Sequence, residues 1–158
     1  MDTVYIETTI PSYLGAHPSR QEPMLTNQRI TQDWWDNERQ GFLLYSSIFV
    51  RTEASGGDPD AAKRRLVYLD GISELPVPDD LDQLEADLIR LFQLPSRAAT
   101  DASHLEMAIL HRMDYVLTWN CTHLANATLL KDLHEYCVYH QLHYPVVCTP
   151  ETLIKFRP

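Results

Sequence analysis

Four side chains with carboxylate or amide oxygens lie at or near the ends of short hydrophobic segments, far apart in the chain. They are Glu7 after residues 4–6, Glu53 after 47–50, Asp101 within 98–105, and Asn120 after 115–119. In an α/β fold, strand ends and the elements that follow them meet at one edge of the sheet, where ligand sites form. Carboxylates gathered there repel one another, and a cation such as Mg²⁺ or Mn²⁺ relieves that repulsion. The pattern therefore predicts a carboxylate metal site.

Short apolar runs alternate with segments of helical spacing along the whole chain. Strands are expected at residues 4–6, 42–46, 73–75, 115–118 and 146–148. Helices are expected at 28–40, 48–54, 58–69, 97–112 and 122–140, with one more capped by Asp79, a helical turn from Pro11, a loop at 17–26 and a short helix opened by 149–151. Strands separated by helices predict an α/β fold, a three-layer α/β/α sandwich around a mainly parallel sheet of four to five strands.

The bulk properties bound the class of protein. A chain of 158 residues with 44% hydrophobic content is expected to form one domain, spanning residues 1–158. No apolar run is long enough for a membrane span, and the N-terminus has no basic region followed by an apolar core. A cytoplasmic protein without a membrane partner is expected. Cys121, Cys137 and Cys148 form no CxxC pair and are expected to be reduced.

The charge balance limits the mode of nucleic-acid binding. Thirteen basic residues against 22 acidic residues leave a net charge of −9. This argues against a broad basic surface laid on phosphates. It is compatible with a nuclease that brings phosphate in through bound metal, and an acidic surface equally suits a basic protein partner.

Each candidate has an ordinary structural alternative. Asp101 is predicted to point towards the sheet edge with His104 on the same helical face, but an acid in the first turn also favours the helix dipole. Glu7 would otherwise be a solvated loop residue. Glu53, expected near the start of a helix that covers the sheet, would otherwise be a surface glutamate. Asn120 would otherwise cap the following helix.

Other chemistries fit the sequence poorly. His134, Cys137, His140 and His143 recur every three residues, but a helix rotates such a row by about 60° at each step, so the four side chains do not surround one zinc ion. The HExxH, GxSxG and phosphate-binding glycine motifs are all absent, and Gly56-Gly57 indicates only a turn.

Four segments together resemble a known family. VYIETTI at 4–10, EASGGDP at 53–59, DASHL at 101–105 and LTWNCTHLAN at 117–126 are similar to PIN-domain proteins, most of all to the VapC-type toxin branch. The resemblance implies a metal-dependent endoribonuclease that hydrolyses RNA phosphodiester bonds with Mg²⁺ or Mn²⁺. It also implies RNA, an antitoxin protein and a second copy of the chain as partners.

The resemblance assigns roles by position. The three acids of the family fall on Glu7, Glu53 and Asp101, as catalytic residues and metal ligands, and the fourth position, often aspartate, falls on Asn120. Glutamate at position 7 is one methylene longer than aspartate, and asparagine at position 120 removes a charge. Further residues are expected to contact the substrate: Thr8, His104 and Arg51, with Arg97 and Arg112 as additional phosphate contacts. The alternatives are a cap of the turn before Pro11 for Thr8, a packed and hydrogen-bonded ring for His104, and ordinary exposed side chains for the three arginines.

The alternative is a degenerate PIN-like module with little or no nuclease activity, acting through protein–protein contacts. The net charge and the two departures from the family pattern favour this alternative. The three carboxylates favour the nuclease, because unpaired acids in one cleft cost stability without a cation.

Overall fold

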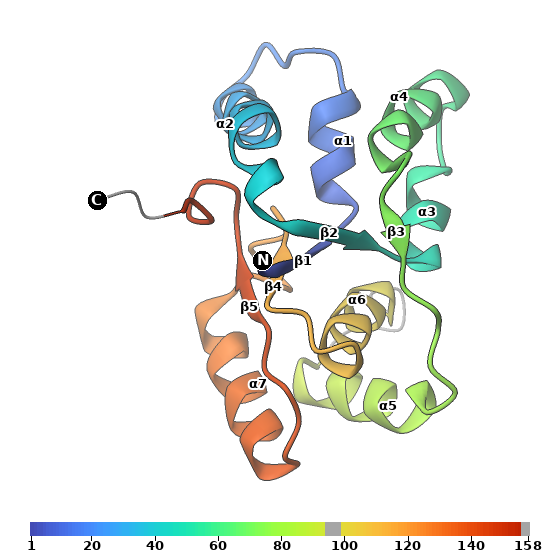
Figure 1. Ribbon diagram of the computed structural model, residues 1–158, viewed down its shortest axis with the longest axis vertical. Helices are drawn as coiled ribbons and strands as arrows, with labels where there is room; N and C mark the ends of the chain where they lie inside the picture. The colour runs from blue at the N-terminus through green and yellow to red at the C-terminus, as the bar shows by residue number, and fades with distance from the viewer. Residues whose placement is uncertain (94–98, 156–158) are drawn as a thin grey trace.

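The computed structural model describes residues 1–93 and 99–155, and its centre is a single five-stranded sheet (Figure 1). The strand order is β3-β2-β1-β4-β5, and every neighbouring pair is parallel. The strands are β1 (Thr3–Ile6), β2 (Leu43–Ser46), β3 (Ser73–Glu74), β4 (Tyr115–Leu117) and β5 (Val146–Cys148). This confirms the predicted α/β class and its parallel sheet.

The central strand β1 is buried on both faces. Val4 and Ile6 pack in one hydrophobic cluster with α1 and α2 residues, whereas Tyr5 packs in the other, and all three side chains are fully buried. Successive side chains of a strand point to opposite faces, so an uninterrupted apolar run is what a sheet covered on both sides requires. The sequence VYI thus places Val4 and Ile6 in one hydrophobic core and Tyr5 in the other.

Seven α-helices cover the sheet in the part of the chain that the structure describes. They are α1 (Thr9–Gly15), α2 (Met24–Asn37), α3 (Ile48–Ala54), α4 (Pro59–Leu69), α5 (Leu81–Leu91), α6 (Ala99–Leu110) and α7 (Ala127–Tyr139), with a 3-10 turn η1 (Arg39–Gly41) after α2. Figure 1 shows α1 and α2 on one side of the sheet, α5, α6 and α7 on the other, and α3 and α4 near the β2–β3 edge. The predicted three-layer sandwich is therefore present.

The helix α1, which follows Glu7, is held in place by close packing against α4. A Cβ atom added at Gly15 would lie 2.9 Å from the backbone carbonyl carbon of Arg64. The Arg64 Nε also donates a hydrogen bond of 2.7 Å to the Gly15 carbonyl oxygen. Only a residue without a side chain allows this approach of the two backbones.

Several predicted boundaries were wrong. The helix predicted from residue 122 begins at Ala127, because the Asn126 side chain caps it by accepting hydrogen bonds from two backbone N–H groups. The helix assigned to an Asp79 cap begins at Leu81, and Asp80 holds the capping position without a side-chain bond. Residues 149–153 form a turn closed on the Thr149 carbonyl oxygen instead of a helix.

Two further differences concern helix ends. The loop expected at 17–26 is shorter, since α2 already begins at Met24, and this helix ends at Asn37 before η1. The helix predicted from residue 97 is described from Ala99 onwards, and its predicted first two residues lie outside the described residues.

Two expectations concern membranes and thiols. Within residues 1–93 and 99–155, no helix combines the length and apolar character needed to cross a bilayer. Cys121, Cys137 and Cys148 are free cysteines; Cys121 is exposed and Cys137 is buried in the core.

Candidate active site

Glu7 is a buried carboxylate at the end of the central strand. It directly follows β1, and only 3% of its surface is exposed. Its Oε2 accepts hydrogen bonds from the backbone N–H of Thr9 (3.0 Å), the Thr9 hydroxyl (2.5 Å) and the Thr118 hydroxyl (2.8 Å). Among the described residues no donor meets the other oxygen, Oε1. The fold therefore holds this carboxylate through Oε2.

Glu53 reaches the same edge from α3. It is the penultimate residue of this helix, so the prediction that it lies near a helix start was wrong. Its Oε1 accepts hydrogen bonds from the Thr8 hydroxyl (2.7 Å) and from His104 Nε2 (2.5 Å). Burial opposes ionisation of this side chain, but the bonds from His104 and Thr8 outweigh burial and hold the Glu53 pKa below its ordinary value. Glu53 is therefore an anion at neutral pH.

A chain of hydrogen bonds beneath Glu53 orients the His104 ring. His104 is fully buried; its Nδ1 lies 2.8 Å from the Tyr5 hydroxyl, which lies 2.7 Å from the Ser47 hydroxyl. Ser47 in turn caps α3 by accepting from the Val50 backbone N–H. Burial raises the pKa of Tyr5 above its ordinary value, so its hydroxyl keeps its proton. One tautomer, with the proton on His104 Nε2, satisfies every bond from Val50 to Glu53.

These residues form a compact set of donor atoms. One ligand atom each from Glu7, Glu53 and His104 can be chosen so that all lie within 4.8 Å of one another. The two carboxylates suit a divalent cation, and Glu7 has one oxygen without a hydrogen-bond donor, whereas both ring nitrogens of His104 are engaged in hydrogen bonds to Glu53 and Tyr5. The donor set therefore fits a metal ion such as Mg²⁺ or Mn²⁺.

Asp101 forms a second, adjacent group. It lies on α6, and its Oδ2 is 2.9 Å from His123 Nδ1 while its Oδ1 is 3.4 Å from Asn120 Nδ2. Asp101 is not among the three residues whose ligand atoms converge. Hydrogen bonds still join the groups, because the Asn120 backbone N–H donates to the Thr118 hydroxyl, which donates to Glu7. The predicted site is thus divided between two neighbouring hydrogen-bonded groups.

Asn120 shapes the loop between β4 and α7. Its side-chain oxygen accepts a 3.0 Å hydrogen bond from the His123 backbone N–H, and the cap of α7 is Asn126. The alternative prediction that Asn120 caps the following helix was therefore wrong. The Asn120 amide instead spans Asp101 and the loop that carries the His123 ring.

Three unpaired acids were expected from the sequence, but two of the three have imidazole partners. The Glu53 carboxylate lies 2.5 Å from His104 Nε2, and the Asp101 carboxylate lies 2.9 Å from His123 Nδ1. Imidazole donors satisfy these two carboxylates by hydrogen bonding. The repulsion that a cation would relieve is consequently smaller than three free carboxylates would produce.

The expected substrate contacts occupy varied settings. Thr8 is 8% exposed, His104 is fully buried, and both are bonded to Glu53. Arg51, on α3, forms an ion pair of 2.8 Å with Glu74 in β3. Arg112 is exposed in the turn after α6, and Arg97 lies outside the described residues.

Four residues that organise the site were not predicted from the sequence, namely Tyr5, Ser47, Thr118 and His123. Three of them had a local signal. Ser47 and Thr118 each follow a strand directly, and His123 stands three residues after Asn120. Tyr5 carried the opposite signal, because a tyrosine inside an apolar strand indicates core packing.

The row of histidines near the C-terminus does not form a metal site in the part of the chain that the structure describes. The His134 ring packs on Tyr144, and the His143 Nε2 lies 2.7 Å from the Met113 carbonyl oxygen. Cys137 is buried in the core, and burial raises the pKa of its thiol to about 11. This agrees with the poor fit of four residues at three-residue spacing.

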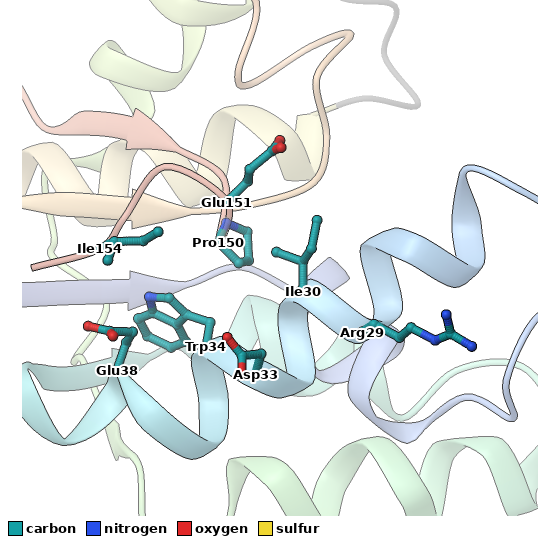
Figure 2. Close-up of a pocket in the computed structure, with 8 residues that line it drawn as sticks. All are labelled: Arg29, Ile30, Asp33, Trp34, Glu38, Pro150, Glu151 and Ile154. Atoms are coloured by element: carbon teal, nitrogen blue, oxygen red, sulfur yellow. The ribbon is translucent and has the colours of Figure 1, made fainter.

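A pocket of about 580 Å³ has none of the candidate acids Glu7, Glu53 and Asp101 in its lining (Figure 2). Its wall combines α2 and its C-terminal cap with the turn after β5, and Trp34 faces Pro150 and Ile154 there. The Trp34 Nε1 donates a 2.6 Å hydrogen bond to the Leu153 carbonyl oxygen, so the indole ring belongs to the core of this chain.

The fold has a counterpart among solved structures. A chain in the crystal structure of VapBC2 from Rickettsia felis, bound to a DNA fragment from their promoter, superposes with a TM-score of 0.51. The match covers 93% of this chain and 98% of that chain at 10% sequence identity. The fold is PIN-like. No family model and no curated protein matches the sequence, so the likeness to VapBC2 concerns the fold alone.

Proposed function

We propose that this chain is a metal-dependent endoribonuclease that hydrolyses RNA phosphodiester bonds. The observation that carries the proposal is the buried Glu7 carboxylate, which converges with Glu53 at the carboxyl edge of a PIN-like parallel sheet. Ligand sites of open α/β sheets lie at this edge. Two carboxylates brought together there repel each other, and a bound cation relieves that repulsion.

In this proposal Glu7, Glu53 and Asp101 hold Mg²⁺ or Mn²⁺. When bound, such an ion lowers the pKa of a coordinated water and polarises a phosphate oxygen. The protein fixes the donor atoms: Thr9 and Thr118 hold Glu7, and His104 and Thr8 hold Glu53.

The remaining predicted residues orient the carboxylates or contact the substrate. The Asn120 amide orients Asp101 and thereby the neighbouring water or phosphate. The bonds of Thr8 and His104 to Glu53 give both residues a positioning role in place of direct substrate contact. Arg51, on the same helix as Glu53, contacts phosphate after leaving Glu74.

The partners follow from the same proposal. The structural counterpart is a chain of the VapBC2 complex. The sequence motifs resemble the VapC-type toxin branch of the PIN-domain proteins. We therefore place this chain in the cytoplasm as the toxin of a type II toxin–antitoxin pair and as a homodimer. A net charge of −9 suits a basic antitoxin segment.

A second candidate is a degenerate PIN-like module that acts through protein contacts. The specific observation in its favour is that Glu53 and Asp101 already have imidazole partners, His104 and His123. Such a module retains its carboxylates without any metal, and its partners are proteins alone.

The test is cleavage of a mixture of structured and single-stranded RNA with Mn²⁺, with Mg²⁺ and with a chelator. Cleavage by the native chain that requires metal and disappears in Glu7→Gln supports the nuclease. Glu135→Gln, which alters an exposed glutamate on α7, is the matched control and should cleave normally. Equal cleavage by Glu7→Gln and the native chain would contradict the proposal, and no cleavage by either favours the degenerate module.

A further inference from the structure

Two aromatic rings form a stack beside the acidic residues. Tyr13 on α1 and Trp119 after β4 have ring centroids 5.8 Å apart and planes inclined by only 8°. The Trp119 indole is fixed by a 2.7 Å hydrogen bond from its Nε1 to the Thr31 hydroxyl. Its backbone N–H donates a 2.8 Å hydrogen bond to the Thr9 hydroxyl. The indole is therefore a rigid support for the Tyr13 ring.

The stack is linked directly to the candidate active site. The Thr9 hydroxyl that accepts from Trp119 also donates to Glu7 Oε2. Burial raises the pKa of the Tyr13 hydroxyl, with further contributions from Cys121 and from the Glu7 charge. The ring stack and these two hydrogen bonds thus connect Tyr13 to Glu7 through Trp119 and Thr9.

Tyr13 also lines an open pocket between α1 and the first half of α2. The pocket has a volume of about 280 Å³. Its lining combines an aromatic ring, aliphatic side chains, two amides and one guanidinium: Tyr13, Leu14, Pro18, Leu25, Gln28, Arg29 and Gln32, with Ala16. The Gln28 amide is already oriented, since its oxygen accepts from the Ser19 N–H and its nitrogen donates to the His17 carbonyl.

This combination matches the chemistry of an unpaired nucleobase. Proteins bind single-stranded RNA by stacking bases on aromatic rings or on arginine planes and by hydrogen bonding to exposed base edges. A peptide segment would fill the aliphatic part of the pocket but would not require a flat ring held parallel to a second ring. The orientation of Tyr13 by Trp119 and the nearby Glu7 favour RNA.

We infer that this pocket is a nucleobase subsite, in which one base of single-stranded RNA stacks on Tyr13 while Arg29 contacts the adjacent backbone. The inference rests on the proposed ribonuclease function and specifies its substrate as an unpaired strand or loop. Stacking tolerates all four bases, so Tyr13 sets affinity for single-stranded RNA without selecting a sequence.

The test measures binding separately from cleavage. A short fluorescein-labelled single-stranded RNA is titrated with protein in Ca²⁺ buffer, and fluorescence anisotropy reports the dissociation constant. Tyr13→Ala should weaken binding by about fivefold to 150-fold, whereas Tyr13→Phe should stay within about twofold because it keeps the ring. Tyr139→Ala removes a tyrosine that is 83% exposed on α7 and should bind as the native chain does.

Two further measurements keep the outcomes distinct. Tyr13→Leu keeps apolar bulk without a flat ring, so weak binding by a folded Tyr13→Leu protein identifies the lost stack and not lost folding. Unchanged RNA affinity in both Tyr13→Ala and Tyr13→Leu would overturn the subsite while leaving the nuclease intact. If these two variants keep their RNA affinity but bind a basic, leucine-rich peptide more weakly than the native chain does, the pocket is a peptide groove instead. A native chain that neither binds nor cleaves RNA overturns the proposed function and the subsite together.

Discussion

His104 Nε2 donates a 2.5 Å hydrogen bond to Glu53 Oε1 across 51 positions of sequence, and this contact joins α6 to α3 at the candidate site. The same ring is bonded through Nδ1 to Tyr5 in the central strand. Glu53 is consequently oriented by the interior of the sheet and not by its own helix. The consequence for function is that a buried, inaccessible histidine controls a carboxylate that is partly exposed.

Removing His104 should alter both stability and acid sensitivity. His104→Ala leaves a cavity and leaves the Tyr5 hydroxyl without its acceptor, which costs roughly 2–4 kcal/mol of unfolding free energy. The native Glu53 pKa is held below its ordinary value of 4.5, so its stabilising contribution is present above that pH and is lost as pH falls further. Thermal melts from neutral pH downwards should therefore decline less steeply in His104→Ala than in the native chain. Parallel curves would show that His104 does not govern Glu53 ionisation.

Asp101→Asn tests whether the second acidic group belongs to the metal site. The substitution keeps the size of the side chain and removes its charge next to His123 and Asn120. If Asp101 holds the ion, Mn²⁺ stabilisation and RNA cleavage should both be lost, cleavage by about 100-fold or more. Thermal shift and gel assays measure the two effects on one preparation. A full Mn²⁺ shift with undiminished cleavage would restrict the site to Glu7 and Glu53.

Glu106 should make the protein less stable as pH rises. The side chain is 1% exposed on α6, and within the described residues its Oε1 has no hydrogen-bond partner. Burial, followed by the charges of Glu85 and Asp82, raises its pKa to about 8. An unfolded glutamate ionises near 4.5, so the folded state alone keeps the proton between about pH 4.5 and 8. The unfolding free energy should fall across that window by up to a few kcal/mol.

Glu106→Gln is the matched variant for this effect because it keeps the shape and cannot ionise. Urea unfolding at several pH values should give a flatter pH dependence for Glu106→Gln, with the largest gain over the native chain above pH 8. Identical pH dependence in the two proteins would mean that Glu106 ionises as readily in the folded as in the unfolded chain.

Gly15→Ala should loosen the packing of α1 on α4. The added methyl would lie 2.9 Å from the Arg64 backbone, which has to move, at a cost of roughly 1–3 kcal/mol. Gly56→Ala is a useful control, since its Cβ would approach only the Glu53 carbonyl oxygen at 3.4 Å. Chemical denaturation of both variants gives the comparison, and a Gly15→Ala protein as stable as the control would contradict the close approach of the two helices.

The sequence was sufficient to predict the sheet and the place of Glu7 at its carboxyl edge. Both follow from local signals, because apolar runs mark strands and parallel strands share one carboxyl edge. Glu53 reaches that edge from the end of α3, where its place depends on how this helix packs. The α7 start was missed because Asn120 and Asn126 are both good caps, and only tertiary contacts show that Asn120 instead binds Asp101 and His123. The imidazole partners of Glu53 and Asp101 depend on how α6 packs on α3 and on the β4–α7 loop, which no short segment encodes.

The central claim is that the buried Glu7 carboxylate forms a divalent-cation site with Glu53. The most direct measurement is the melting temperature of the native chain and of Glu7→Gln over a titration with Mn²⁺, with Glu135→Gln as the control. A ligand that binds only the folded state raises its stability by mass action. The melting temperature should rise with Mn²⁺ in the native chain and in Glu135→Gln, and stay constant in Glu7→Gln. An equal rise in all three proteins, or no rise in the native chain at millimolar Mn²⁺, would contradict the claim.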